Sequence, residues 1–356
     1  MIAGKVGACS EGFLPLQPMR CLVLLFLFAA RAGIAQPPPG YYDSAQGLTG
    51  EALRAALSDI ISPHSVLANS QLWAAFARTD RRPDGSVWDM YSDVPGGSSP
   101  YVYQFVIDQC GVYDSEGDCF NREHTFPVSW FNDAAPMSTD LHHIYPADAW
   151  VNQQRGSWPY GIVTAPAWTS QNGGKRGPCS LPGCSGTVFE PINAFKGDLA
   201  RAHLYMLTRY MTESASWPGP VLNAGSWLPW VESILLAWHT QDPVSQKETA
   251  RNDSVFVIQG NRNPYIDHPE WVQSIWGPEA GVEEIAGSRS LWYADGALHS
   301  SAAWPMDVNV RDAAGRLVRS ARIHAAGQPL PMPLPQGLYF VEAGGTETLR
   351  FRFIAQ

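Results

Sequence analysis

A carboxylate, an imidazole and an amide lie in the central part of the chain. Glu123 and His124 are neighbours, and Asn152 follows further along the sequence. A neutral imidazole can take a proton from water near pH 7. Glu123 and Asn152 supply two oxygen ligands, which suits Mg²⁺ because this ion keeps several waters and accepts further oxygens from a phosphate. These residue types indicate phosphodiester hydrolysis by activated water, with one divalent ion acting as a Lewis acid.

Two arginines accompany this set. Arg122 directly precedes Glu123, and Arg155 follows Asn152 by three residues. A guanidinium can clamp a non-bridging phosphate oxygen and stabilise charge in the transition state. We therefore predict catalytic roles for His124, Arg155 and Arg122, with Glu123 and Asn152 as metal ligands. The alternative for each arginine is an ion pair with nearby carboxylates.

The elements around these residues must bring them together. Residues 146–155 contain no proline or glycine after Pro146 and end before Gly156, which predicts a short helix with Asn152 and Arg155 side by side. Glu123 and His124 pose a difficulty, since adjacent residues of a regular strand face opposite sides. Their convergence requires a strand end or a bulge at this point.

Other polar groups of the central region favour supporting roles. We expect Asp140 to brace a turn, and one of His142 and His143 to support the site while the other packs in the core. The Asn-rich segment 259–263 suits a bracing loop under the site. A zinc-protease interpretation fails because the chain contains no HExxH. A group of aromatic residues could stack bases, although core packing is the stronger interpretation: Trp130, Phe131, Trp150, Trp158 and Tyr160.

Three ordered motifs resemble the endonuclease I family. The first is Gly117–Pro127 with Ser129–Phe131, the second is Thr139–Asp148 with Val151, Asn152 and Arg155, and the third is Gln259–Glu270. The resemblance spans roughly residues 41 to 277. One departure is Trp150 with Gln153 and Gln154, in a helix that often carries small residues in the family.

This resemblance implies an α+β fold with a ββα-metal (His-Me finger) nuclease core and surrounding helices. It implies that His124 is the general base and that Glu123 and Asn152 bind one Mg²⁺, for which Mn²⁺ or Ca²⁺ could substitute. The family cleaves DNA, and in many members RNA, with little sequence preference and leaves 5′-phosphates. Disulfides are common among its exported members.

The overall composition is that of a globular protein with room for one large and one small domain. Of the 356 residues, 45% are hydrophobic and 16% are charged. The formal net charge of −9 does not exclude a nucleic-acid ligand, because phosphate binding needs only local cations. It predicts modest affinity and strong sensitivity to salt.

The first residues have the features of an export signal. Arg20 precedes the apolar run 21–30, and Gly33 and Ala35 form a small-residue cleavage site, so we assign residues 1–35 to a signal peptide, with Met19 as an alternative start. The run is too short to span a bilayer as a helix, which predicts no membrane anchor. We expect a protein that is secreted or located at the cell surface.

Cysteine spacing agrees with export. The mature chain keeps two close pairs, Cys110 with Cys119 and Cys179 with Cys184, which predict two disulfides in an oxidising compartment. The alternative is a four-thiolate zinc site, although neither pair has CxxC spacing.

Apolar residues at helical spacing predict a helix over residues 50–62, and 71–78 is a second expected helix. Two further helices are expected over 197–212, which is amphipathic, and 229–240, since neither contains Pro or Gly after its first turn. We expect strands over 88–91 and 101–107, the latter from its aromatic and β-branched composition. The composition changes near residue 280. We divide the mature chain into a catalytic domain (36–280), a linker (281–290) and a β-rich domain (291–356).

The C-terminal domain is expected to be a small sandwich of about seven short strands. Its strands and the ending at 352–354 resemble the sorting domain of proteins exported by the type IX secretion machinery, with an ordinary accessory β-domain as the alternative.

Three functions are compatible with the sequence. The leading hypothesis is an exported, monomeric, Mg²⁺-dependent endonuclease that cuts DNA without sequence preference. The second is an exported ribonuclease on the same core. The third is a surface-displayed binding protein that has lost activity, against which the intact Glu123, His124 and Asn152 argue.

Overall fold

A computed structural model describes residues 37–277 and, beyond them, 291–294, 296–300, 306–312, 316–324, 329–335, 337–344 and 348–355. The predicted signal peptide and the predicted linker at 281–290 lie outside these residues. Within the described part, no helix is both long enough and apolar enough to cross a membrane.

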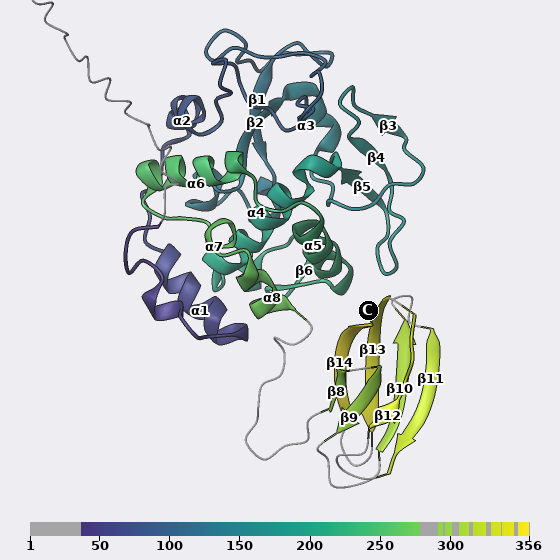
Figure 1. The fold of residues 1–356 in the computed structure, drawn as a ribbon. Coiled ribbons are helices and arrows are strands. Elements are labelled where there is room, and N and C mark those ends of the chain that lie inside the picture. Colours follow the sequence, from purple (N-terminus) through teal and green to yellow (C-terminus); the bar gives the residue numbers. More distant parts are fainter. Residues whose placement is uncertain are drawn as a thin grey trace, which may run out of the picture. The chain divides into compact units, whose positions relative to one another are not determined.

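Helices dominate the described residues up to 277 (Figure 1). The four predicted helices are confirmed with small changes of boundary. The helices are α1 (Gly50–Ile61), α2 (Leu72–Thr79), α3 (Ala149–Arg155), α4 (Lys196–Arg209), α5 (Pro229–Gln241), α6 (Gln246–Gln259), α7 (Pro264–Asp267) and α8 (Glu270–Trp276).

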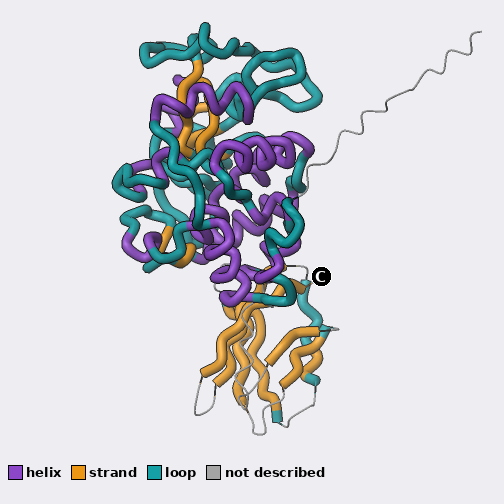
Figure 2. Tube along the Cα trace, turned by 90° about the vertical axis from the view of Figure 1, so that its left-hand side faces the viewer, coloured by secondary structure: helices purple, strands orange, loops and turns teal. Residues whose placement is uncertain are grey.

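The strands of this part are short and form small antiparallel sheets, with loops making up much of the chain around them (Figure 2). β1 (Phe120–His124) pairs with β2 (Ile144–Asp148). β3 (Trp168–Thr169), β4 (Lys175–Pro178) and β5 (Thr187–Glu190) form a second sheet, and β6 (Leu222–Asn223) pairs with β7 (Ser226–Trp227). The mixture confirms the α+β class.

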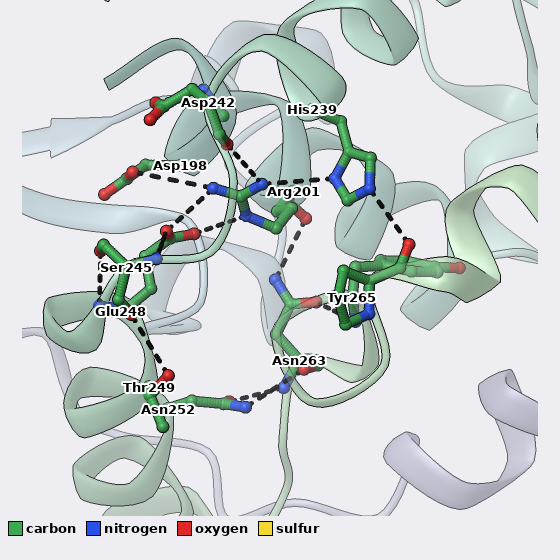
Figure 3. A network of polar contacts seen from close by, with 12 residues as sticks. Asp198, Arg201, His239, Asp242, Ser245, Glu248, Thr249, Asn252, Asn263 and Tyr265 are labelled. Atoms are coloured by element: carbon green, nitrogen blue, oxygen red, sulfur yellow. Dashed lines mark hydrogen bonds and ion pairs between the residues drawn. The ribbon is translucent and has the colours of Figure 1, made fainter. Parts of the chain in front are cut away.

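α4 is the central helix of this part, and it is buried on nearly all sides rather than amphipathic as expected. Such burial brings polar groups inside, where each needs a partner. Arg201 satisfies this requirement by donating to the Glu248 carboxylate at 2.5 and 2.8 Å and to the Asp242 carbonyl at 2.9 Å (Figure 3). One guanidinium thus ties α4 to α6 and to the end of α5.

The start of α4 depends on a glycine. A Cβ at Gly197 would lie 2.0 Å from the Asp242 carbonyl oxygen. This close approach lets the Gly197 N–H donate to the Asp242 carboxylate at 2.8 Å. Any larger residue at 197 would push α4 away from the end of α5.

The two predicted strands at 88–91 and 101–107 are wrong, since both segments are irregular. Their backbone groups bond to scattered partners rather than to a neighbouring strand: the Val87 N–H donates to Tyr103 O and the Trp88 N–H to Asp80 O. Val106 has a φ of 73°, which is incompatible with a strand. The aromatic residues that suggested strands are here anchors for loops.

The described C-terminal residues form two sheets, as predicted. β11 (Leu317–Ile323), β10 (Met306–Asp312), β13 (Gly337–Gly344) and β14 (Thr348–Ala355) make one, and β12 (Leu330–Pro331), β9 (Ala297–Ser300) and β8 (Leu291–Ala294) make the other. One core unites them, with Leu298 from β9 packed among Val308, Val310 and Val341. The proposed sorting role of this domain stays a prediction.

Both predicted disulfides are present, Cys110–Cys119 and Cys179–Cys184, with Cα atoms 5.7 and 6.0 Å apart. Because each pair is bonded within itself, the zinc alternative for these four cysteines is wrong.

Buried neutral histidines should make this fold sensitive to acid. His203 lies in α4, where its Nδ1–H donates to Leu199 O at 2.9 Å, and burial lowers its pKa to about 3. Between pH 6.5 and about 3 the unfolded chain binds a proton at this residue that the folded chain does not, so the free energy of unfolding falls as the pH falls.

We predict that His203→Phe, which keeps an aromatic ring against Phe126 and Tyr160, reduces this pH dependence by about 1.4 kcal/mol per pH unit. Urea unfolding of both proteins at pH 4.5, 5.5 and 6.5 measures the difference. Parallel pH profiles for the two proteins would contradict the assignment.

Candidate active site

β1 and β2 are antiparallel strands joined by the long segment 125–143, and β2 leads directly into α3 (Figure 1). Asp148 ends the strand and caps the helix, because its Oδ1 accepts the Val151 N–H at 2.7 Å. The helix therefore begins at Ala149, and the predicted start at Pro146 is wrong. It ends before Gly156, whose φ of 54° favours glycine.

Glu123 is almost completely buried, with 1% of its surface exposed. Its Oε1 accepts a hydrogen bond from the Tyr91 hydroxyl at 2.7 Å and lies 3.2 Å from Nη1 of Arg155. Burial raises the pKa of this carboxyl, whereas Arg155 and the hydroxyls of Tyr91 and Tyr160 act in the opposite direction. Glu123 is thus a carboxylate surrounded by donors.

Arg155 is equally buried and holds the end of β1 in place. Besides contacting Glu123, its Nη1 donates to His124 O at 2.9 Å and its Nη2 donates to Thr125 O. The guanidinium also lies 4.7 Å from the ring centre of Tyr160. The structure therefore shows the ion pair that the sequence left open for Arg155, and the phosphate contact stays a prediction.

Asn152 reaches from α3 to β1. Its Nδ2 donates to Arg122 O at 3.2 Å and to Asn121 Oδ1 at 2.7 Å. A backbone carbonyl only accepts hydrogen bonds, so the end of the amide that faces Arg122 O must be the NH₂ group. These two bonds fix the orientation of the Asn152 side chain, and both involve its NH₂ group rather than Oδ1.

β1 carries Glu123 and His124, and Asn152 contacts Asn121 and Arg122 of the same strand. Side chains alternate along β1, so Asn121 and Glu123 share one face, and Asn152 lies against Asn121 on that face. His124 is the last residue of β1. The strand end that the sequence argument required is present.

His124 is held by a backbone carbonyl. Its Nε2 lies 3.1 Å from Ser138 O, and its ring centre lies 5.6 Å from that of His143. Because a carbonyl cannot donate, Nε2 must carry the proton and Nδ1 is the basic nitrogen. Burial lowers the pKa of His124, with Arg122 and Arg155 acting in the same direction and Ser138 opposing it.

Arg122 points to the other side of the strand. It contacts both the carbonyl and the side-chain oxygen of Asn69, and its guanidinium lies 5.1 Å from the ring centre of Trp73. These contacts differ from the carboxylate pair considered from the sequence. Its proposed phosphate contact stays a prediction.

Asp140 is a structural brace, as expected. It accepts hydrogen bonds from the hydroxyls of Tyr205 and Tyr210, both at 2.8 Å, and from Gln259 Nε2 at 3.0 Å. Asn261 Nδ2 in turn donates to the Tyr205 hydroxyl at 2.8 Å. Apart from the exposed Gly260, the segment 259–263 is buried, so its predicted bracing role fits the structure.

His142 and His143 are both buried, and each faces a carbonyl. His142 Nε2 lies 3.2 Å from Asn261 O, and His143 Nε2 lies 2.7 Å from Met137 O. Burial lowers their pKa values to about 4 and about 3. Both are therefore neutral near pH 7, and His143 is the one that lies against His124.

The predicted preference of the aromatic cluster for core packing holds for Trp130, Phe131 and Tyr160, which are buried. Trp158 differs, because 45% of its surface is exposed. It directly follows Ser157, whose hydroxyl lies 3.1 Å from that of Ser129.

Glu123 and Asn152 fit a hard divalent ion by their chemistry. Asn152 directs its NH₂ group toward β1, and the contacts of Tyr91 and Arg155 with Glu123 both fall on Oε1. In the described part of the chain, no group of three or more His, Cys, Asp or Glu side chains could hold a metal ion. A pair of oxygen ligands would therefore rely on water and substrate, as Mg²⁺ allows.

Sequence reasoning missed Tyr91 as part of this site and gave Asn121 no role, although Asn121 lies two residues before Glu123 within the first motif and so shares its face of the strand. Tyr91 lies far from the motifs in sequence, and no local pattern distinguishes it from the other tyrosines.

Comparison with known proteins identifies the family. Residues 49–270 match the family described as Endonuclease I. The chain belongs to this family. The endonuclease I match covers β1, β2 and α3 together with the helices that support them.

The relatives of the chain include extracellular nucleases. An extracellular ribonuclease of Bacillus amyloliquefaciens is 38% identical over 248 residues, which are 66% of the chain and 78% of that protein. An extracellular ribonuclease of Bacillus subtilis (strain 168) is 34% identical over 264 residues, 71% of the chain and 83% of that protein. An extracellular deoxyribonuclease of Aeromonas hydrophila is 29% identical over 135 residues, 37% of the chain and 50% of that protein. The chain is therefore a nuclease, and its relatives support a secreted protein.

The buried pair of Arg155 and Glu123 should contribute to the stability of the fold. We predict that Arg155→Met lowers the free energy of unfolding by about 3–5 kcal/mol, because it leaves a buried carboxylate without its cation. Glu123→Gln should also be destabilising, and the double variant should be more stable than the sum of the two effects by about 1–3 kcal/mol. Urea unfolding of the four proteins tests this, and simple additivity would refute the coupling.

Proposed function

We propose that this chain is a secreted, Mg²⁺-dependent nuclease that hydrolyses phosphodiester bonds of nucleic acids without sequence preference. His124 is the general base, and one metal ion is held by Glu123 and Asn152. The observation that carries the proposal is the bond between His124 Nε2 and Ser138 O, because it leaves Nδ1 as the basic nitrogen of a neutral imidazole.

In the reaction, Nδ1 of His124 takes a proton from water as the water oxygen forms a bond to phosphorus. The bond from phosphorus to the 3′ oxygen breaks, which leaves a 5′-phosphate and a 3′-hydroxyl. The bond to Ser138 O holds the ring so that Nδ1 keeps one direction throughout. His124 then passes its proton to solvent or to the leaving oxygen.

When bound, Mg²⁺ would supply Lewis-acid stabilisation of the charge that develops on the phosphate and the leaving oxygen. Glu123 and Asn152 would hold it in a fixed position, with Mn²⁺ or Ca²⁺ as substitutes. Burial raises the pKa of Glu123, and Arg155 opposes this rise while it fixes the backbone at residues 124 and 125. This arrangement of two strands and a helix supports the ββα-metal core that the motifs predict.

The substrate class rests on the relatives. The two that align over most of their length are named ribonucleases, whereas the deoxyribonuclease aligns over half of its length. We therefore extend the leading DNA hypothesis to include RNA as a substrate of equal rank. The groups assigned to the reaction act on the attacking water or on the phosphate, and both polymers share the phosphate.

Removing His124 should abolish cleavage and leave the fold intact. We predict that His124→Ala lowers the rate by at least about 100-fold, because general-base catalysis contributes about 10² to 10⁴, while the melting temperature falls by only a few degrees. The measurement is a plasmid and total-RNA digest beside thermal unfolding. His324→Ala, which removes an exposed histidine of the C-terminal domain, is the control. Full activity in His124→Ala would remove this residue from the base role.

Chelation should stop cleavage of both substrates. We expect EDTA to abolish digestion of supercoiled plasmid and of RNA, and millimolar Mg²⁺ to restore both. Restoration with RNA alone would identify a ribonuclease. Digestion that continues in EDTA after dialysis would contradict the metal assignment.

A further inference from the structure

Tyr91 is brought to Glu123 from a distant loop. Its hydroxyl donates to Glu123 Oε1 at 2.7 Å, and both residues are 1% exposed. The loop that carries Tyr91 belongs to none of the three motifs. The Glu123 carboxylate therefore accepts a hydrogen bond from a buried, neutral hydroxyl in addition to its ion pair with Arg155.

The hydroxyls of Tyr91 and Tyr160 form a directed chain. They lie 2.9 Å apart, and either could be the donor by distance alone. Since Tyr91 gives its only proton to Glu123, Tyr160 must donate to Tyr91. The order is Tyr160 to Tyr91 to Glu123, and such a chain strengthens each of its bonds.

Tyr91 is itself held rigidly. The Asp89 carboxylate accepts the Tyr91 N–H at 2.7 Å through Oδ1 and the Asp148 N–H at 2.8 Å through Oδ2. Asp148 is the cap of α3, the helix that carries Asn152. One carboxylate thus sets the position of the donor to Glu123 and the start of the helix that presents Asn152.

We propose that Tyr91 is a positioning residue for metal binding: its hydroxyl, supported by Tyr160, fixes Oε1 of Glu123 so that the carboxylate presents its second oxygen to the ion. This inference rests on the proposed function. The closest approach of Arg155 to Glu123, from Nη1 to Oε1 at 3.2 Å, falls on the oxygen that Tyr91 binds. The directed hydrogen bond from Tyr91 to that oxygen restricts rotation of the carboxylate.

The alternative is that Tyr91 only fills space in the core. Its ring centre lies 5.3 Å from that of Phe189. Phenylalanine at position 91 would preserve this ring contact and remove the hydroxyl alone. A purely structural role would therefore change stability without changing the affinity for a divalent ion.

The test measures metal affinity apart from catalysis. Calorimetric titration of the full mature chain with Mn²⁺, without nucleic acid, gives the dissociation constant of wild type, Tyr91→Phe and Tyr160→Phe. We expect Tyr91→Phe to weaken Mn²⁺ binding by about 10-fold or more, which is the usual effect of losing a partner of a metal ligand. Tyr160→Phe should have a smaller effect, because the bond from Tyr91 to Glu123 remains.

Tyr265→Phe is the matched control, since it removes another buried tyrosine hydroxyl, one that contacts Thr208. It should bind Mn²⁺ like wild type. In cleavage assays, Tyr91→Phe should need a correspondingly higher Mg²⁺ concentration and recover most of its rate at saturation, with the KM for nucleic acid little changed.

The outcomes distinguish a failure of the Tyr91 inference from a failure of the proposed metal site. Wild-type affinity for Mn²⁺ in Tyr91→Phe would overturn the inference and leave the proposed nuclease mechanism intact. A wild-type chain that binds no Mn²⁺ would overturn the metal assignment and the inference with it. Should Tyr91→Phe not fold, unaltered Mn²⁺ affinity in Tyr160→Phe would count against the hydroxyl chain.

Discussion

A single buried guanidinium organises the candidate site. Arg155 pairs with Glu123 and donates to the carbonyls of His124 and Thr125, so one side chain at the end of α3 fixes three consecutive residues of β1 and its exit. Burying such a charge is costly unless it is paired. The loops that bring Tyr91 and Tyr160 to this point add a hydroxyl donor to Glu123 and an aromatic ring to the guanidinium.

The residues of the candidate site can be identified in the sequence because they lie in short motifs. Glu123 and His124 are adjacent, and Asn152 and Arg155 share a helix whose end is marked by Gly156. The orientation of these groups was not readable. Whether Arg155 faces a phosphate or Glu123 depends on packing between α3 and β1, which no local spacing encodes.

Helices could be predicted from the sequence where apolar periodicity or a capping pattern specifies them. Irregular loops that are held by tertiary contacts could not. α1 and α5 follow their apolar spacing, and α6 could have been found from Ser245 and Glu248, which form a capping box. The segments around Tyr91 and Tyr103 resemble strands in composition, yet their backbone bonds go to remote carbonyls. Irregular structure of this kind is specified by tertiary contacts alone.

The disulfide between Cys110 and Cys119 lies next to the junction of β1 and α3. Cys119 directly precedes β1, and its carbonyl accepts the Ala149 N–H at the start of α3. Oxidation therefore restrains the chain at the junction of strand and helix on which the catalytic groups depend. The stability of this junction therefore depends on the redox state of the compartment. In the reducing cytosol, where the nuclease would meet the nucleic acid of its own cell, the junction lacks the disulfide and is less restrained than in an oxidising compartment.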